Sequence, residues 1–157
     1  MTTTTLLSAG VQLLTDHPAQ LDELLARPEE WPAAVEELLR FISPTTLTGS
    51  TALVDAEVDG CRVPAGQQRV ISFAGANRDS TVFENPDQLD VTRSPNPHLA
   101  FSAGAHYCLG APLARMHAEI ALPALFSKLP GLRLAGPPVW LGSVPVRQIA
   151  ALPVQWN

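Results

Sequence analysis

The sequence predicts a mainly α-helical protein with small β-sheets, a fold of the α+β class. Apolar residues recur at intervals of three and four in the first 42 residues and again after residue 108, which is typical of helices packed on one face. Between these regions, tight-turn residues separate short extended runs, and the C-terminal tail repeats this pattern. Fifteen prolines spread along the chain indicate short elements with sharp ends.

Three helices are expected in the first 43 residues. The first carries apolar residues at helical spacing, and His17-Pro18 ends it. A short second helix covers Ala19–Arg27. The third begins near Pro32, which suits the first helical position, and Pro44 forbids its continuation. The apolar face of the third helix consists of Val35, Leu38, Leu39 and Ile42.

A small β region follows the third helix. Thr45–Ala52 is rich in threonine and leucine and is expected to be extended, and Asp55–Val58 carries a second strand signal. Asp59-Gly60 is typical of a type I′ hairpin turn, in which both central residues need positive φ. A further tight turn at Pro64–Gly66 precedes a strand over Arg69–Phe73.

The second half of the chain combines a long loop, one helix and a terminal hairpin. No periodicity persists from Ala76 to Pro97, and a loop of roughly twenty residues is usually functional. The last helix begins after Cys108, and Pro123 is expected to kink it or to end its regular part. The turn residues Gly136-Pro137-Pro138 introduce the hairpin. One stripe of the helix is expected to face a core: Leu109, Leu113, Met116 and Ile120.

The composition is that of one globular unit, with 157 residues of which 46% are hydrophobic and 16% charged. A formal net charge of −5, with Lys128 the single lysine, argues against nucleic acid as a partner, because such binding neutralises phosphates with cations. Apolar stretches such as Ile120–Phe126 are far shorter than the ~20 residues that span a bilayer, and the first residues lack the pattern of a secretory signal. We therefore expect a soluble, cytoplasmic protein without a nucleic-acid or membrane partner.

The stretch Phe101–Gly110, with the sequence FSAGAHYCLG, carries the most informative chemistry. Gly104 and Gly110 flank Cys108 in a turn that opens a helix, so backbone can pass close to a flat ligand on either side of the sulfur. The N–H groups at a helix start favour the thiolate, the form of cysteine that binds metals. Taken alone, Cys108 also fits the commoner case of a small buried hydrophobe, and Cys61 is expected to be a bystander thiol.

The same stretch matches a longer known pattern, F-G-x-G-x-H/R-x-C-x-G, with Ser102 in place of the first glycine. The matching residues are Phe101, Gly104, His106, Cys108 and Gly110. An E-x-x-R motif is present as Glu37–Arg40, and further matching runs follow at residues 63–66, 76–79, 83–90, 97–101 and 110–115. The order and number of these motifs resemble the cytochrome P-450 family, in particular its soluble bacterial members.

The resemblance implies a haem-thiolate site with Cys108 as the catalytic and metal-binding residue, the axial ligand to the iron of haem b. In the family the thiolate pushes electron density onto the iron and favours cleavage of dioxygen. Phe101 is expected to pack beside the sulfur and the porphyrin. Further cofactor-binding residues implied by the resemblance are Gly104 and Gly110, which admit the porphyrin, and His98 and His106, which reach its propionates.

The resemblance also implies a structural network behind this loop. Glu37 and Arg40 are three residues apart and share one helix face, where an exposed ion pair is worth only about 0.3–0.5 kcal/mol. In the family this pair joins an arginine at the position of Arg93. We assign all three residues to structure and not to catalysis, because an arginine network can hold the path of a long loop.

The match covers residues 1–157 as a single partial domain, the haem-ligating C-terminal region of a truncated cytochrome P-450 fold. It begins near the end of the family's long central helix, so a large exposed apolar surface is expected. By register, Thr2 falls on the threonine of the oxygen-activating motif A-G-x-D/E-T and is a candidate catalytic residue, whereas Met1 replaces the acidic residue. Ser50 stands where many relatives carry an arginine that binds a haem propionate, and His117 stands at a common glutamate position.

Two functions of different kinds remain open. The first is a fragment of a haem-thiolate monooxygenase. Its family reaction is the O₂-dependent hydroxylation of a small organic or secondary-metabolite substrate, with a ferredoxin-type electron donor and a companion chain that supplies the N-terminal region. The second is a non-catalytic, haem-free relative that acts as a binding partner. A third interpretation, a zinc site, lacks the paired spacing of structural zinc ligands and would use His98, His106, Cys108 and His117.

Overall fold

A computed structural model describes residues 2–142 and 144–156. Its helices are α1 (Thr2–Asp16), α2 (Pro18–Ala26), α3 (Trp31–Ile42), α4 (Phe73–Ala76) and α5 (Ala111–Lys128), with 3-10 turns η1 (Pro28–Glu30) and η2 (Gly104–His106). Its strands are β1 (Leu47–Thr51), β2 (Ala56–Val58), β3 (Cys61–Val63), β4 (Gln68–Ser72), β5 (Arg133–Leu134), β6 (Val139–Leu141), β7 (Gln148–Ala151) and β8 (Val154–Gln155). The α+β class predicted from the sequence is confirmed.

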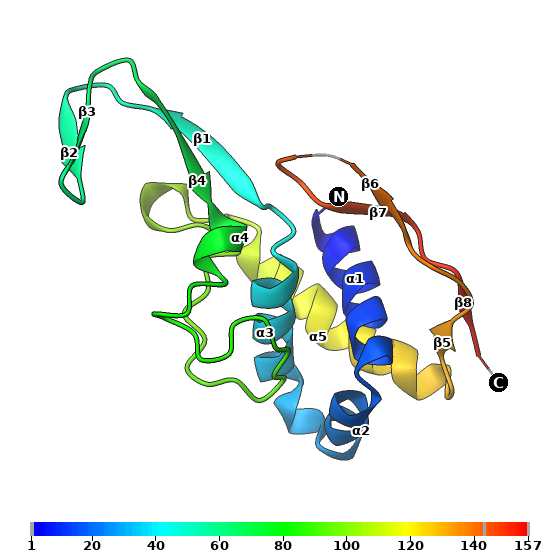
Figure 1. The fold of residues 1–157 in the computed structure, drawn as a ribbon. Coiled ribbons are helices and arrows are strands. Elements are labelled where there is room, and N and C mark those ends of the chain that lie inside the picture. Colours follow the sequence, from blue (N-terminus) through cyan, green and yellow to red (C-terminus); the bar gives the residue numbers. More distant parts are fainter. Residues whose placement is uncertain (1, 143, 157) are drawn as a thin grey trace.

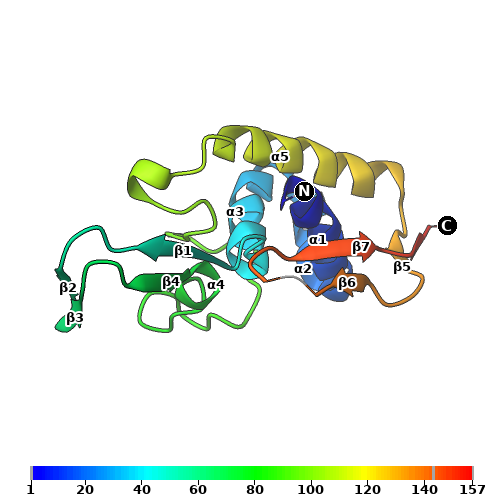
Figure 2. The same ribbon diagram turned by 90° about the horizontal axis from the view of Figure 1, so that it is seen from above.

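Helices α1, α3 and α5 pack on one another at the centre of the molecule, and α5 lies across the other two (Figures 1 and 2). The β1–β4 sheet projects from the helices on one side, and the β6–β7 hairpin runs along α1 on the other (Figure 1). The sheets in the described part of the chain are two-stranded and antiparallel: β1–β4, β2–β3, β5–β8 and β6–β7. The terminal hairpin expected from the sequence is therefore present.

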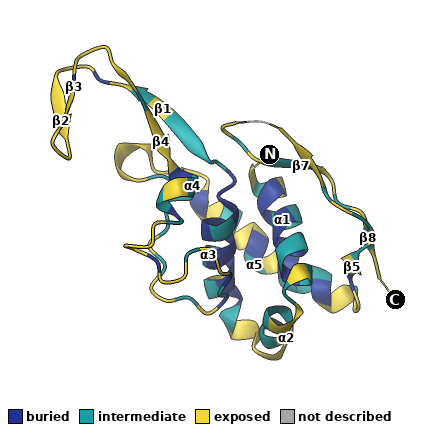
Figure 3. Ribbon diagram, in the orientation of Figure 1, coloured by how far each residue is buried: buried dark blue, intermediate teal, exposed yellow. Residues whose placement is uncertain are grey.

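Most of the buried apolar side chains form one cluster centred between the helices (Figure 3). Leu6 and Leu14 of α1, Leu38 of α3 and Leu122 of α5 are at most 1% exposed. Burying a leucine side chain contributes about 1.5–3 kcal/mol, so this cluster is the main apolar support of the three helices. The apolar face expected for the third helix is confirmed, because its four residues are all buried: Val35, Leu38, Leu39 and Ile42.

The predicted core stripe of the last helix is wrong. Its four residues are exposed, by 98% at Leu109, 52% at Leu113, 47% at Met116 and 62% at Ile120. The helix has apolar residues on two faces, and α1 and α3 cover the other one, which carries Ala118, Leu122 and Phe126. The spacing of apolar residues alone does not show which of two apolar helix faces is buried. The large exposed apolar surface that the family resemblance implied is present at this stripe.

Two further boundaries bear on the predictions: one of the two outcomes expected at Pro123 is excluded, and strand β4 ends one residue earlier than predicted. Helix α5 continues through Pro123 to Lys128, so the proline does not end it, although its ring nitrogen has no proton to donate. Strand β4 ends at Ser72, because the Ser72 Oγ accepts a hydrogen bond from the Gly75 N–H (3.0 Å) and caps the short helix α4. The turn between β2 and β3 agrees with the prediction: φ is +49° at Asp59 and +75° at Gly60, as a type I′ turn requires.

Candidate functional site

The candidate site is the loop that carries Cys108, between η2 and α5. The Cys108 N–H donates to the Phe101 carbonyl (3.0 Å), and the Cys108 carbonyl accepts from the Ala111 N–H (3.2 Å). These bonds close the loop on both sides of the cysteine, and its side chain remains exposed. Helix α5 begins three residues after Cys108, so the positive end of its dipole lies at this end of the loop.

Gly110 leaves space beside the sulfur, and Gly104 has a backbone conformation that favours glycine. A Cβ atom at Gly110 would lie 3.9 Å from the Cys108 Sγ, and Gly104 adopts a φ of +66° with no atom within 4 Å of its missing side chain. Ser102 also lies in the left-handed region, at a φ of +64°. That conformation costs an L-residue roughly 1–2 kcal/mol, so the loop is strained at the position where the family pattern has glycine.

Cys108 borders a cavity of about 400 Å³ whose walls are mostly apolar. The start of α1 reaches it through Thr2 and Thr3, and α5 reaches it through Leu113 and His117. The end of α3 contributes Leu39, and the chain on either side of the β1–β4 sheet contributes Thr45 and Phe73. The cysteine loop itself contributes Phe101, His106 and Gly110. The structure thus brings Thr2, Phe101, His106 and Gly110 to the same cavity as Cys108.

The Phe101 ring is held from several sides. The guanidinium of Arg115 lies over it at 4.6 Å from the ring centroid. The rings of His98 and Tyr107 lie at 6.2 and 6.3 Å from it, both tilted, which is a favourable arrangement for aromatic pairs. A cation over an aromatic face contributes about 0.5–2 kcal/mol, so α5 holds the first residue of the loop in place.

Glu36 of α3 anchors this assembly. It accepts two hydrogen bonds from Arg115, at 2.6 and 2.8 Å, and a third from the His98 Nε2 at 3.0 Å. Arg115 also donates to the Tyr107 hydroxyl (3.0 Å). Burial alone raises the pKa of Glu36, but the hydrogen bonds from Arg115 and His98 outweigh it and hold the pKa at about 2. Glu36 therefore stays charged and links α3, α5 and the cysteine loop.

His98 lies against Glu36 of α3. Its side chain is 3% exposed, and its Nδ1 accepts a hydrogen bond from the Ala100 N–H (3.2 Å) while its Nε2 donates to Glu36. Both ring nitrogens are thus engaged by the protein, and the residue does not line the cavity. The contact of His98 with a haem propionate stays a prediction, and of the two histidines His106 is the one that lines the cavity.

A second network lies behind the loop, around Glu37. Its carboxylate accepts a hydrogen bond from Arg40 at each oxygen, both at 2.8 Å. It also accepts from the Arg93 Nε (3.1 Å), the Asn96 side chain (3.0 Å) and the Asp90 N–H (3.0 Å). Both Glu37 and Arg40 are completely buried. The structure thus brings together the three residues that the resemblance assigned to a structural network.

Arg40 ties this network to the long loop. Its five N–H groups all have acceptors, because besides Glu37 they reach the carbonyls of Asn77, Pro86 and Gln88 at 2.8–3.2 Å. Asn77 is itself buried and accepts a hydrogen bond from the Leu99 N–H (2.7 Å), two residues before Phe101. One buried arginine therefore connects α3, the loop of residues 77–97 and the start of the cysteine loop.

Three residues of these networks are not singled out by any sequence pattern: Glu36, Asn77 and Arg115. Glu36 precedes the E-x-x-R motif, and the other two lie inside runs that were matched to the family without a role being assigned. The proposed zinc site is not assembled, because no group of three or more metal-binding side chains comes together anywhere in residues 2–142 and 144–156. None of the helices in these ranges has the length and apolarity needed to cross a bilayer.

Comparison with known proteins identifies the class to which this fold and loop belong. The family model for Cytochrome P450 matches residues 31–129, and the chain belongs to the cytochrome P450 family. It is 46% identical over 134 residues to the biotin biosynthesis cytochrome P450 of Bacillus subtilis (strain 168), covering 85% of this chain and 34% of that protein. It is 46% identical over 155 residues to nocardicin C N-oxygenase of Nocardia uniformis subsp. tsuyamanensis, covering 95% and 39%.

Solved structures of cytochromes P450 share the fold of this chain. The crystal structure of P450BioI in complex with an acyl carrier protein ligated to hexadec-9Z-enoic acid superimposes with a TM-score of 0.97 at 42% identity, over 99% of this chain and 41% of that one. PksS of Bacillus subtilis 168, a cytochrome P450 of a bacillaene polyketide synthase, gives a TM-score of 0.94 at 38% identity, over 100% and 42%. The chain thus spans about 40% of the solved relatives, and 34–39% of these curated ones.

The residues around Cys108 fit the haem that the family implies. The exposed sulfur borders an apolar cavity, Gly110 leaves room beside it for a flat ring, and His106 offers a polar group at the cavity wall. The thiolate is also the ligand chemistry of a haem that activates dioxygen. No rearrangement of buried residues is needed to expose the sulfur.

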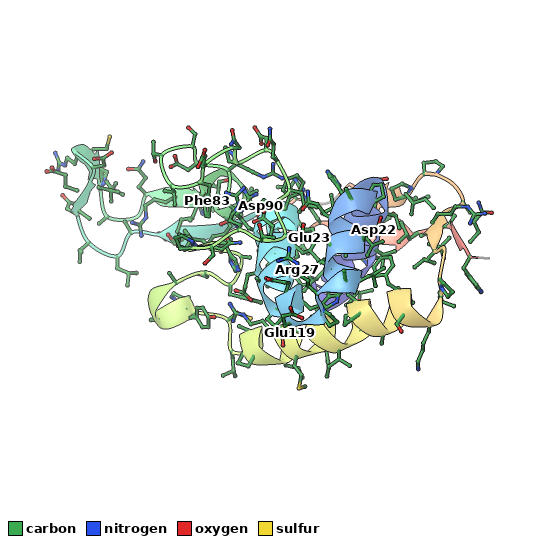
Figure 4. All side chains as sticks on the ribbon, turned by 90° about the horizontal axis from the view of Figure 1, so that it is seen from below. Asp22, Glu23, Arg27, Phe83, Asp90 and Glu119 are labelled. Carbon is green, nitrogen blue, oxygen red and sulfur yellow. The ribbon has the colours of Figure 1, made fainter. Side chains whose placement is uncertain are left out.

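Replacing Arg40 with methionine is expected to lower the free energy of unfolding by about 3–5 kcal/mol, because the Glu37 carboxylate remains buried with fewer partners. Arg27→Met is the matched control, since Arg27 is 44% exposed and pairs with Glu23 at the helix surface (Figure 4). Urea denaturation followed by circular dichroism measures both. Equal losses in the two variants would contradict a special role for the buried pair.

Glu36→Gln is expected to lower the free energy of unfolding at neutral pH by about 2 kcal/mol, because it removes charged hydrogen bonds to Arg115 and His98. The pKa of Glu36 is depressed in the folded state, so its stabilisation is complete above pH 4.5 and is lost as the pH falls toward 2. The wild-type chain should therefore lose more stability over this range than the variant in urea titrations. Glu23→Gln, at an exposed helix position, serves as control, and parallel pH profiles for wild type and Glu36→Gln would refute the assignment.

Ser102→Gly is expected to raise the free energy of unfolding by up to about 1 kcal/mol, because glycine adopts the observed φ of +64° without strain. Gly104→Ala is the matched opposite change, since it places a Cβ at a φ of +66° and should destabilise the loop by a similar amount. Thermal denaturation of the two variants should show midpoint shifts of opposite sign. Shifts of the same sign would show that backbone conformation does not control this loop.

Proposed function

We propose that residues 1–157 form the haem-ligating region of a cytochrome P450 monooxygenase, with Cys108 as the axial thiolate ligand of haem b. The observation that carries the proposal is the exposed Cys108 sulfur at the wall of an apolar cavity, between two glycines and beside a helix start. A buried cysteine would have favoured a packing role instead. Family membership supports the same assignment.

The other residues of the loop have distinct roles in this proposal. Gly104 and Gly110 admit the ring on either side of the sulfur, and Phe101 packs against it from a position held by Arg115. His98 and His106 are the histidines assigned to the propionates; His106 lines the cavity, and His98 is held in place by its bond to Glu36. The helix start of α5 stabilises the negative charge of the thiolate.

When bound, a thiolate-ligated haem supplies the activation of dioxygen for transfer of an oxygen atom to a substrate. The protein's part is to hold the sulfur charged and oriented and to keep an apolar space beside it. Thr2 lies at the wall of this cavity and is the candidate for a hydroxyl that holds a proton near bound oxygen. Its hydroxyl can donate and accept one hydrogen bond at the same atom, which suits that task.

The proposal includes a small organic substrate, a ferredoxin-type electron donor and a companion chain. Relatives named for nocardicin C oxygenation and biotin biosynthesis support a small-molecule substrate. A companion chain is consistent with the exposed apolar stripe on α5, at Leu109, Leu113, Met116 and Ile120, because exposed patches of this kind mark interaction surfaces.

The proposal predicts that the purified chain binds haemin and that its reduced carbon monoxide complex absorbs at the long wavelength typical of thiolate ligation. Cys108→Ala should abolish this band, and Cys61→Ala, at the other exposed cysteine, should leave it unchanged. Absorption spectroscopy of the three proteins measures the result. The same band in Cys108→Ala and wild type, or no haemin binding by the wild type, would overturn the proposal and favour a haem-free binding partner.

A further inference from the structure

One cation on the β1–β4 sheet has no partner. The side chain of Arg69 in β4 forms no hydrogen bond or ion pair with any residue that the structure describes, although its Nε atom is buried; its backbone pairs with β1. Every other arginine in the described ranges donates to a carboxylate or carbonyl oxygen. A buried donor without an acceptor is unfavourable, so the environment of Arg69 indicates a missing acceptor.

Ser50 lies directly opposite Arg69 and has the same deficiency. The two residues are register partners in the antiparallel β1–β4 pair, so their side chains share one face of the sheet with Cβ atoms about 5 Å apart. The Ser50 Oγ is also buried and without a partner. A guanidinium and a hydroxyl can both donate to the oxygens of one carboxylate, and a charged acceptor makes such bonds stronger.

The two strands that carry the pair start at the wall of the cavity at Cys108. Thr45, just before β1, and Phe73, just after β4, both line this cavity, so the two strands leave from its wall. The Ser50–Arg69 pair is three residues further along than the first register pair, Leu47–Ser72, which corresponds to about 10 Å. In both Figure 1 and Figure 2 the sheet and the loop around η2 extend from the helices on the same side.

Among the described residues that line the cavity at Cys108, none is a lysine, an arginine, an aspartate or a glutamate. This lining itself supplies no charged side chain of these four types, so a cation outside the lining has to be considered. A haem held at Cys108 carries two propionate groups at one edge, and burying a carboxylate without a cation is costly. His106 is one polar partner at the cavity wall, and Arg69 is the arginine at the edge of this region whose charge is not already used.

We propose that Arg69 and Ser50 form a carboxylate-binding site that holds a propionate of the haem ligated by Cys108. The inference rests on the proposed function, because it needs haem at that cysteine. Arg69 donates from its guanidinium and Ser50 from its hydroxyl, so each buried donor gains the acceptor that it lacks. Because the two residues lie on paired strands, the site is held rigidly relative to the cavity wall.

The test is a titration of the full chain with haemin and with haemin dimethyl ester, which lacks the two carboxylates, with no other organic acid present. Arg69→Ala is expected to weaken haemin binding by about tenfold, measured from the change in haem absorption, and to leave binding of the ester unchanged. Wild type should prefer haemin to the ester by at least the same factor. Arg62→Ala, on the neighbouring strand β3 with a 79% exposed side chain, is the matched control and should bind both ligands like wild type.

A second variant keeps the test independent of folding effects. Ser50→Arg with Arg69→Val moves the guanidinium across the strand pair to the same face, and it should bind haemin within about threefold of wild type. Equal losses of haemin and ester in Arg69→Ala, or no loss of either, would overturn the carboxylate site while leaving Cys108 ligation intact. Failure of wild type to bind haemin, or binding unaffected by Cys108→Ala, would instead overturn the proposed function and this site with it.

Discussion

The buried ion pair between Glu37 and Arg40 is the interaction on which the rest of the structure depends. Two charges without solvent are stable only when all their hydrogen-bonding groups find partners, and here all five N–H groups of Arg40 have acceptors. Three of those acceptors are backbone carbonyls of a loop that forms little regular structure. The loop therefore takes its path from the arginine, since few strand or helix bonds are available to define it.

Helix α3 holds two separate regions through adjacent residues. Glu36 and Glu37 point about 100° apart around the helix, so one carboxylate faces Arg115 and the cysteine loop while the other faces Arg40 and the long loop. Asn77 joins the two regions, because it accepts from Leu99 just before Phe101 and its carbonyl accepts from Arg40. The position of the Cys108 loop is thus set from α3 and α5 together, and Phe101 is the residue at which the two supports meet.

The packing of the three helices determines which apolar side chains of α5 are covered. One face of α5 is covered by α1 and α3, whereas its other face leaves Leu109, Leu113, Met116 and Ile120 exposed. The β1–β4 sheet, in contrast, carries two buried polar groups without an acceptor, the Ser50 Oγ and the Arg69 Nε. Uncovered apolar side chains and unpaired buried donors are both unfavourable, and of these residues Leu113 lines the cavity that Cys108 borders.

The sequence by itself determined the fold class, the approximate helix and hairpin boundaries and the cysteine loop, because these depend on local signals. Pro32 and Pro44, the Asp59-Gly60 turn and the pattern around Cys108 act within a few residues of where they stand. Only the tertiary structure decided which face of α5 is buried, where His98 points and which cation is left unpaired. Those outcomes depend on partners such as Glu36 and Arg115, which are 79 residues apart, and residue spacing along one element carries no information about them.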